Sequence, residues 1–418
     1  MFRVFTVIVY VSFLSLVPVD SVIDLKESLE ELTTQYTHLA RLAKACYHAT
    51  GPHVFEMKLH KLADRNVTCN DGTAAGYYLR KAHGSKRWVV YLEGGGFCNS
   101  AASCEYRYST MKELMSSDKW GNVQYKTGTG ILSRNPRENP TWWNANHVFI
   151  PYCSSDAWSG NAFSWQTGER FSFLGTKILE RVFEELMFKG LYHAKHLLLA
   201  GSSAGGIGVI LNLDRLARRL QMAALKVQVR GLADSGWYID LTDCTAGGKQ
   251  NCLPAQPQNA AMILQGMSYW RGVVPDDCAR RNPKKKWRCY FGEHVYRTDS
   301  KSPKHTPLFV FQWLYDIEQL KLFGISVLNP NDKQSALFLG MKVKDSLNHT
   351  KALRCAVFAP SCVSHTILMR DDWLKTVVGG KNLNQALDDW YQSSGQGSAS
   401  CKSLIETAMP QNCESNLD

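Results

Sequence analysis

The sequence LLLAGSSAGGIGVILNLDRL, residues 197–216, sets a short apolar run against a cluster of small residues and then resumes an apolar rhythm of helical period. The first part has the length of a buried strand, and the last part has the spacing of an amphipathic helix. Between them, Gly201-Ser202-Ser203-Ala204-Gly205 fits the pattern G-x-S-x-G, in which a strand-to-helix turn presents a serine. The segment therefore predicts a strand, a sharp turn and a helix, with Ser203 at the turn.

The glycines of this turn have a physical role. A sharp turn holds the serine in a strained conformation, and bulky neighbours would collide with the strand or the helix. Ser203 would then stand at a helix N-terminus, where free N–H groups favour negative charge. A bare G-x-S-x-G match is nevertheless a weak signal, and a plain turn explains it equally well. Evidence for catalysis has to come from the rest of the chain.

Through the middle of the chain, apolar runs of strand length alternate with amphipathic stretches. This alternation indicates parallel βαβ units with helices on both faces of a sheet, so the expected fold class is α/β. The strand-like runs are 88–92, 147–151, 196–200 and 307–314, and the helix-like stretches include 174–188 and 206–220.

The ends of the chain differ from its middle. Residues 1–21 have the layout of a secretory signal, with Arg3 before an apolar stretch that is shorter than the ~20 residues of a membrane span. Residues 22–60 are expected to form an N-terminal helical arm, because apolar residues recur every three or four positions from Leu25 to Cys46. A catalytic domain over 61–390 and a flexible tail over 391–418 complete the predicted organisation. We expect a secreted monomer that does not span a membrane.

The thirteen cysteines agree with an oxidising compartment, where disulfides persist. Their spacing lacks the C-x-x-C pairs of a zinc site, so no metal is expected. Connectivity does not follow from sequence, and the odd total leaves one thiol unpaired or joined to another chain. Pairs close enough to pin a loop are Cys98/Cys104, Cys244/Cys252 and Cys278/Cys289.

Two sequons, at Asn66 and Asn348, predict glycosylation on exposed loops of a secreted chain. The formal net charge is +11, which favours acidic partners. Outside the cell the available polyanion is sulfated glycosaminoglycan rather than nucleic acid. The stretch RRNPKKKWR concentrates the charge, although a solvated loop between Cys278 and Cys289 explains it equally well. The candidate polyanion patch comprises Arg280, Arg281, Lys284, Lys285, Lys286 and Arg288.

A second glycine cluster lies upstream of the serine. In WVVYLEGGGFC, residues 88–98, three glycines follow a predicted strand, where hydrolases with this turn carry an HGGG-type loop. Backbone N–H groups of such a loop, together with that of Ala204, can donate to a developing oxyanion, each contributing ~3 kcal/mol. A phosphate-binding loop is the alternative, but no Lys-Ser/Thr follows the glycines.

A triad on this fold runs in the order Ser, acid, His. Asp316 ends the apolar run TPLFVFQWLYD, and His365 lies in APSCVSHTIL, so both stand in the right order. His365 would take the proton of Ser203, and the carboxylate would fix the imidazole tautomer. Spacing alone places them only slightly ahead of the other candidates, which are the acids Asp234, Asp240 and Asp243 and the bases His294, His305 and His349.

Eight ordered motifs resemble the Notum branch of the pectin acetylesterase family over residues 61–373. They are YLEGGGFC, TGTGILS, ENPTWWNANHVFIPYCSSDAWSG, LLLAGSSAGGIGVILNLDRL, VRGLADSGW, YWRGVVPDDC, VFQWLYD and APSCVSHTI. The resemblance implies an extracellular α/β-hydrolase with no cofactor, a mostly parallel sheet, and disulfide-pinned insertions that form an acyl pocket. It also implies a carboxylesterase that removes the palmitoleoyl group from a serine of Wnt proteins and associates with glypican heparan sulfate.

Carried onto matching positions, the resemblance makes Ser203 the nucleophile, Asp316 the acid and His365 the base, with Gly95 and Ala204 as oxyanion donors. One position departs from the Notum pattern, because Gly96 stands where that branch has a tryptophan that helps wall the acyl pocket. The glycine is expected to widen or reshape the cavity. Aromatic residues remain where the family lines its pocket, namely Phe97, Tyr290 and Phe291.

Two rival functions stay open. Gly96 supports an extracellular esterase of another range, either a carbohydrate O-acetylesterase or a general lipid esterase that leaves Wnt proteins untouched. The net charge supports a polyanion-binding protein on an inactive hydrolase fold. That second rival requires a broken triad, and all three triad members are present in the sequence.

Overall fold

The computed structural model describes residues 56–242, 258–297, 305–326, 329–350, 356–393 and 403–407, together with Thr33 and Thr37. The chain divides into two units, Met1–Phe55 and Glu56–Asp418. The predicted signal over 1–21 and all of the predicted arm up to residue 55, apart from those two threonines, lie outside the described residues. Among the helices that the structure describes, none is long and apolar enough to cross a membrane.

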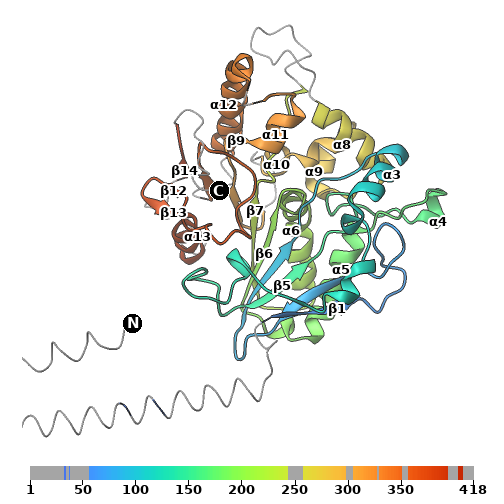
Figure 1. The fold of residues 1–418 in the computed structure, drawn as a ribbon, viewed down its shortest axis with the longest axis vertical. Helices are drawn as coiled ribbons and strands as arrows, with labels where there is room; N and C mark the ends of the chain where they lie inside the picture. The colour runs from blue at the N-terminus through green and yellow to red at the C-terminus, as the bar shows by residue number, and fades with distance from the viewer. Residues whose placement is uncertain are drawn as a thin grey trace, which may run out of the picture. The chain divides into compact units, whose positions relative to one another are not determined.

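The second unit is built on a sheet of ten described strands (Figure 1). Its order is β14-β10-β8-β7-β6-β3-β5-β2-β1-β4; neighbours from β14 to β5 are parallel, and β2, β1 and β4 are added antiparallel. The strands are β1 (Met57–Lys61), β2 (Gly76–Arg80), β3 (Arg87–Leu92), β4 (Tyr125–Lys126), β5 (Asn146–Ile150), β6 (His196–Ser202), β7 (Gln228–Asp234), β8 (Leu308–Phe311), β10 (Val357–Ala359) and β14 (Leu404–Ile405).

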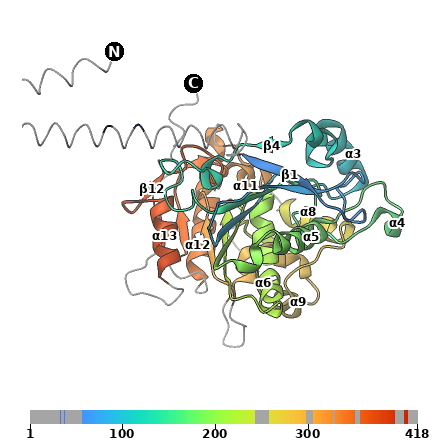
Figure 2. The ribbon, with the colours of Figure 1, turned by 90° about the horizontal axis from the view of Figure 1, so that it is seen from below.

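Alternate residues of each central strand belong to separate cores. In β6, Leu197 and Leu199 join a core with residues of α5, α6 and α12, whereas Leu198 and Ala200 join one with α13. Figures 1 and 2 show α6 and α13 on opposite sides of the sheet. Both faces are covered, which explains why these strands are continuously apolar. The helices concerned are α5 (Gly175–Phe188), α6 (Ala204–Met222), α12 (Lys333–His349) and α13 (Leu383–Gln392).

The predicted fold class is therefore confirmed, with small shifts of boundary. The expected strand over 307–314 is shorter, because β8 ends at Phe311 and the chain then leaves the sheet. It pairs again as β9 (Tyr315–Asp316) with β11 (Val363–Ser364), in a small parallel sheet of its own. The smaller elements outside the main sheet include α3 (Ala101–Thr110), α4 (Ser164–Thr167), α8 (Gln258–Tyr269), α9 (Asp276–Arg281), η5 (Lys286–Tyr290), α10 (Gly292–Val295) and α11 (Ile317–Leu322). A hairpin is formed by β12 (Val377–Val378) and β13 (Lys381–Asn382).

Both ends of the predicted catalytic domain need correction. The expected arm over 22–60 extends too far, because Met57–Lys61 is strand β1, paired with β2 and β4. The expected tail over 391–418 contains β14, which pairs in parallel with β10. Glu406 fixes this strand, because its carboxylate accepts hydrogen bonds from the backbone N–H and the hydroxyl of Ser361, both at 2.7 Å. Strands this short, five residues in β1 and two in β14, leave too little pattern to be found by periodicity.

Disulfides pin the loops at the upper end of the sheet. The bridge Cys69–Cys153 joins residues that are 84 apart in the chain, a separation from which the sequence alone did not predict a pair. Cys362 is also disulfide-bonded. The expected Cys244/Cys252 pair lies outside the described residues. The two predicted pairs that the structure describes are both formed, Cys98–Cys104 and Cys278–Cys289.

Candidate active site

Ser203 occupies the predicted turn between β6 and α6. Its backbone is at φ 57° and ψ −123°, a conformation that non-glycine residues rarely adopt. A Cβ on Gly201 would lie 2.5 Å from the carbonyl oxygen of Gly205, and one on Gly205 would lie 2.1 Å from that of Leu92. Strain of this kind costs about 1–3 kcal/mol and accumulates at functional sites. The turn therefore raises the serine above the strand ends at a definite energetic cost.

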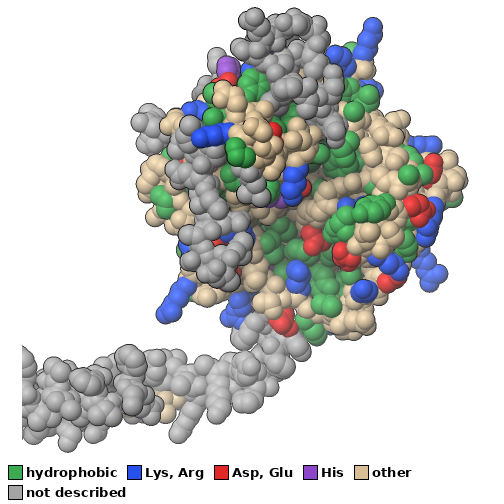
Figure 3. All heavy atoms as spheres, turned by 45° about the horizontal axis from the view of Figure 1, so that its top comes forward, with side chains coloured by type: hydrophobic (Ala, Val, Ile, Leu, Met, Phe, Trp, Pro, Cys, Tyr) green, Lys and Arg blue, Asp and Glu red, His purple; other side chains and the backbone are tan. Residues whose placement is uncertain are grey.

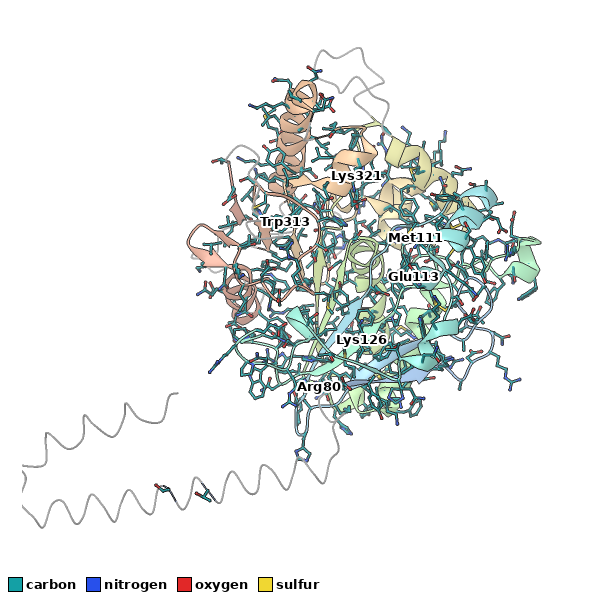
Figure 4. All side chains as sticks on the ribbon, in the orientation of Figure 1. Arg80, Met111, Glu113, Lys126, Trp313 and Lys321 are labelled. Atoms are coloured by element: carbon teal, nitrogen blue, oxygen red, sulfur yellow. A yellow bond between two sulfur atoms is a disulfide. The ribbon has the colours of Figure 1, made fainter. Side chains whose placement is uncertain are left out.

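The serine lies at the carboxyl edge of the parallel strands. In register, Leu92 of β3 is opposite Gly201, and Ser202 is opposite Asp234 of β7. Ligands of open α/β sheets bind outside this edge. Figure 4 shows Lys321, on α11, at the opposite end of the sheet from Arg80, which lies near the amino ends of these strands. The loops near Lys321 therefore surround the site.

Ser203 lines a cavity of about 180 Å³. Aliphatic side chains of α6, α8 and α11 form much of the wall, among them Ile207, Ile263 and Leu322. In the space-filling view, hydrophobic side chains gather around a hollow on the face where the upper end of the sheet comes forward (Figure 3). All four residues expected in the acyl pocket line the cavity: Gly96, Phe97, Tyr290 and Phe291.

His365 is held by Asp316. Its Nδ1 lies 2.8 Å from Oδ2 of Asp316, whose side chain is only 1% exposed. The other carboxylate oxygen, Oδ1, caps α11 and accepts the N–H groups of Glu318 at 3.1 Å and Gln319 at 3.0 Å. A carboxylate fixed on both oxygens selects the imidazole tautomer with the proton on Nδ1, which leaves Nε2 free to accept one.

The environment of His365 favours the protonated ring. Burial is the largest single influence and opposes the charge, but the charge and hydrogen bond of Asp316, together with weaker contributions from other carboxylates, raise the pKa of His365 above its ordinary value of 6.5. The charges of Asp234 and Glu318 add to this effect. The histidine is thus a stronger base than a free imidazole, as proton transfer from a hydroxyl requires.

Asp234, a competing acid, has a different place. Its Oδ2 accepts the hydroxyl of Ser202 at 2.5 Å and the backbone N–H groups of Ile367 at 2.9 Å and Leu368 at 3.1 Å. The hydroxyl of Ser235 completes the link, donating to Oδ1 of Asp234 at 2.8 Å and accepting the N–H of Thr366 at 3.0 Å. The carboxylate therefore ties the turn at Ser203 to the loop that carries His365, and no hydrogen bond joins it to the imidazole.

The other acid and base candidates that the structure describes have partners away from Ser203. Nε2 of His294 contacts Asp240 at 2.9 Å, and Nδ1 of His305 contacts Asp214 at 2.7 Å. His349 is exposed, and it lines with His294 and Asp240 a separate hollow of about 530 Å³ that lacks Ser203. Asp243 lies outside the described residues. Of the four candidate bases, only His365 combines a carboxylate partner with a loop tied to the turn at Ser203.

The glycine loop lies directly against Ser203. A Cβ on Gly94 would be 2.5 Å from the carbonyl oxygen of Ser202 and 2.9 Å from Cβ of Ser203. Gly95 and Gly96 have φ angles of 136° and 68°. Among the described residues, no acceptor lies within hydrogen-bonding distance of the amide N–H groups of Gly94, Gly95 and Gly96. Ala204 begins α6, where the first N–H groups lack intrahelical partners.

Two polar residues of the cavity were not found from the sequence. The hydroxyl of Tyr238 interacts with that of Ser203, and burial together with the charge of Asp316 raises the pKa of the phenol far above its usual range. Glu318 also lines the cavity, and its carboxylate accepts a hydrogen bond from Lys321 at 2.7 Å. Neither residue belongs to a spaced pattern, so no sequence signal marks them. They give one side of the cavity a polar character.

The candidate polyanion patch is smaller than predicted. Arg281 turns inward and donates to Asp277 at 3.0 Å and to the carbonyl of His294 at 3.1 Å. Nε of Arg288 lies 3.1 Å from Asp240, and its side chain is mostly buried. Both arginines thus hold the loop together instead of facing solvent. The cations that remain exposed are those of Arg280, Lys284, Lys285 and Lys286.

The sequons differ in setting. Asn66 is exposed in a turn, as expected. Asn348 is exposed too, but it lies in the last turn of α12 instead of a loop, and the hydroxyl of Thr350 in that sequon donates to the carbonyl of Ser346 at 2.9 Å. The buried apolar positions of α12 extend to Leu347, directly before the sequon, so the helix reaches over Asn348. In the part of the chain that the structure describes, no cluster of three or more His, Cys, Asp or Glu side chains could hold a metal.

Comparison with known proteins finds one family and close relatives. The family model described as Pectinacetylesterase matches residues 51–416. Palmitoleoyl-protein carboxylesterase notum1a of Danio rerio is 42% identical over 90% of this chain and 73% of its own, and human palmitoleoyl-protein carboxylesterase NOTUM is 43% identical over 84% and 70%. The structure of the Wnt deacylase Notum from Drosophila superposes with a TM-score of 0.76 at 38% identity, covering 85% of this chain and 98% of that one.

Proposed function

The chain belongs to the pectinacetylesterase family of carboxylic ester hydrolases, and on that premise we propose that it is a secreted serine carboxylesterase that removes palmitoleate from a serine of lipidated Wnt proteins and so lowers Wnt signalling. One observation carries the proposal: Ser203 stands in a strained turn in the wall of a largely apolar cavity, and its turn is tied through Asp234 to the loop of the paired His365. The names of the relatives support the substrate.

The first half of the reaction transfers the acyl group to the enzyme. Oγ of Ser203 attacks the ester carbonyl while Nε2 of His365 accepts the hydroxyl proton. The C=O π-bond opens to an oxyanion, which the N–H groups of Gly95 and Ala204 stabilise. When the carbonyl re-forms, the bond to the substrate's serine oxygen breaks and His365 returns its proton to that oxygen. Asp316 keeps the ring oriented throughout.

The second half releases the fatty acid. A water molecule attacks the acyl-enzyme carbonyl, His365 accepts a proton from it, and a second oxyanion forms in the same place. Collapse of this intermediate breaks the bond to Oγ of Ser203, which recovers its proton from His365. The products are a free carboxylic acid and an unmodified serine hydroxyl. No group outside the side chains named and water is needed for the balance of atoms.

The cavity volume favours a second candidate within the same chemistry. An apolar cavity of ~150 Å³ holds a benzene molecule, so about 180 Å³ suits a medium acyl chain better than a sixteen-carbon one unless wall side chains move. The polar groups of Tyr238 and Glu318 also reduce its apolar lining. A secreted esterase of shorter acyl range, acting on lipid or carbohydrate esters, is therefore the alternative.

Partners and location follow from the same premise. Secretion is supported by the disulfides, which persist in oxidising compartments. The exposed cations of Arg280, Lys284, Lys285 and Lys286 are proposed to contact heparan sulfate, including that of glypicans. We expect the enzyme to act as a monomer.

A chromogenic octanoate ester tests the nucleophile. Ser203→Ala is expected to lower kcat by at least ~10³-fold, since removing a triad serine leaves only binding and oxyanion stabilisation. The exposed Ser109→Ala on α3 is the matched control and should retain full activity. A Ser203→Ala protein that melts at the wild-type temperature and still turns over the ester would remove Ser203 from this role.

A further inference from the structure

Arg107 contacts the glycine loop from behind. Its Nη2 donates to the carbonyl oxygen of Gly95 at 2.6 Å, and its Nη1 would lie 3.8 Å from a Cβ on Gly96, with no other atom within 4 Å of that point. Its Nε donates to the hydroxyl of Ser155 at 2.9 Å. The guanidinium therefore lies beneath the peptide that joins Gly95 to Gly96.

Arg107 is a buried cation. It is 5% exposed, and among the described residues it forms no ion pair with a carboxylate. A buried charge without a counter-ion costs desolvation free energy, so its hydrogen bonds must offset that cost. Its acceptors are one backbone carbonyl and one hydroxyl. Burial lowers the pKa of Arg107, although the group stays charged at any physiological pH.

The helix that carries Arg107 is itself fixed to the loop. Cys104, three residues earlier on the same face of α3, is bonded to Cys98, which directly follows the loop. The N–H of Cys98 donates to the carbonyl of Ser155 at 3.2 Å, so the same residue anchors both the loop end and the guanidinium. Arg107 is thus held independently of substrate.

The contact between Arg107 and the carbonyl of Gly95 also determines the direction of the N–H of Gly96. The described peptide bonds are trans, and in a trans peptide the C=O and the following N–H point in opposite directions. A carbonyl of Gly95 directed at Arg107 therefore turns the N–H of Gly96 to the opposite side. Two successive glycines at positive φ lack any side chain that would prevent the peptide from flipping. A flipped peptide would present an oxygen atom where a donor is needed.

We propose that Arg107 is a positioning residue that holds the Gly95–Gly96 peptide in the one orientation in which the N–H of Gly96 faces the substrate oxyanion. The inference rests on the proposed esterase function and adds to it a third oxyanion donor, the N–H of Gly96 beside those of Gly95 and Ala204, together with the buried cation that orients it. Arg107 does not touch the reacting atoms. It acts on the transition state through the peptide, so its loss affects kcat more than substrate binding.

The experiment compares Arg107→Ala and Arg107→Lys with wild type on the octanoate ester. For Arg107→Ala we expect kcat to fall about 100-fold, the effect of losing one oxyanion donor, while KM changes less than about threefold. Arg107→Lys, which can still donate one hydrogen bond to the carbonyl of Gly95, should retain an intermediate kcat. Methylguanidinium added at millimolar concentration should restore part of the kcat of Arg107→Ala by occupying the vacated space.

The control is Arg230→Ala. Arg230 is also 5% exposed and donates to two backbone carbonyls, those of Trp390 at 3.1 Å and Tyr391 at 2.6 Å, but it lies in the first half of β7, away from the carboxyl edge. The Arg230→Ala protein should lose thermal stability without losing kcat, and methylguanidinium should not change its rate.

An Arg107→Ala protein with wild-type kcat, or one that loses only melting temperature, overturns the inference. If Arg107→Ala does not fold, Arg107→Lys provides the test instead. A wild-type kcat in Arg107→Lys, with unchanged affinity for a trifluoromethyl ketone inhibitor and no response to methylguanidinium, would also overturn the inference. Absence of esterase activity in wild type overturns the proposed function instead.

Discussion

Asp316 and Asp234 are two buried carboxylates that follow neighbouring strands, and only their hydrogen bonds separate their roles. Asp316 contacts the imidazole of His365, whereas Asp234 contacts the backbone just after it. Chain order and spacing did not decide which of the two is the acid partner of the histidine, because both follow apolar runs and precede His365. Which of the two carboxylates contacts the imidazole of His365 depends on where the loop from Ser361 to Leu368 folds back. That is tertiary information, which a local pattern does not contain.

Asp316→Asn is expected to lower kcat by about 10⁴-fold without unfolding the protein, because the amide favours the wrong imidazole tautomer. The pH profile gives a second readout. His365 works as a neutral base and its pKa is raised by Asp316, so wild-type kcat/KM should rise with pH through a value above 6.5. Removing the carboxylate lowers that pKa, and the rising limb should move to lower pH.

The comparison variant is Asp234→Asn, which leaves the ring partner in place. It should move the rising limb less than Asp316→Asn, because Asp234 acts on His365 only through its charge. If the limb stays in place in Asp316→Asn and shifts in Asp234→Asn, the acid has been assigned to the wrong residue.

At the scale of elements, the strand, turn and helix over 197–216 were predictable because every local preference agrees there. The cavity was not predictable, because its walls come from α6, α8, η5 and α11, which are distant in the chain. Of the cavity residues named in advance, the turn pattern supplied Ser203 and Ala204, and the family resemblance supplied the acyl-pocket residues. Tyr238 and Glu318 have no such signal, and β14 and the Cys69–Cys153 bridge depend on partners far along the sequence.

Helix α8 offers a test of acyl length. Ile263 is buried and lines the cavity, whereas its neighbour Leu264 is 54% exposed. Ile263→Trp should fill part of the cavity, and each acyl methylene excluded costs about 0.8 kcal/mol. We expect kcat/KM to fall at least tenfold on an octanoate ester and less than about twofold on an acetate ester. Leu264→Trp should change neither rate. Equal losses on both esters in Ile263→Trp would show that the cavity does not hold the acyl chain.

At the scale of the whole molecule, the net charge of +11 is dispersed. On the face in Figure 3, Lys and Arg side chains are spread around the periphery instead of forming one field. Composition predicted attraction to polyanions but not its location, because Arg281 and Arg288 are engaged in internal ion pairs. The exposed lysines of the 280–288 stretch are therefore the part of the patch to test.

Replacing Lys284, Lys285 and Lys286 with alanine should release the protein from immobilised heparin at lower salt, because fewer counter-ions are displaced on binding. Esterase rates should not change. The control removes the same charge from exposed lysines elsewhere, Lys58, Lys61 and Lys119. An equal shift in both triple variants would mean that net charge, and not this stretch, determines heparin binding.

The central claim is that Ser203 hydrolyses the palmitoleate ester on a Wnt serine. Mass spectrometry of a palmitoleoylated Wnt-derived peptide incubated with the purified protein tests this claim most directly. Wild type is predicted to convert the peptide to its free-serine form with release of palmitoleic acid, and Ser203→Ala to leave it intact. A wild-type enzyme that cleaves octanoate esters but leaves the peptide acylated would contradict the claim and establish the shorter acyl range suggested by the cavity.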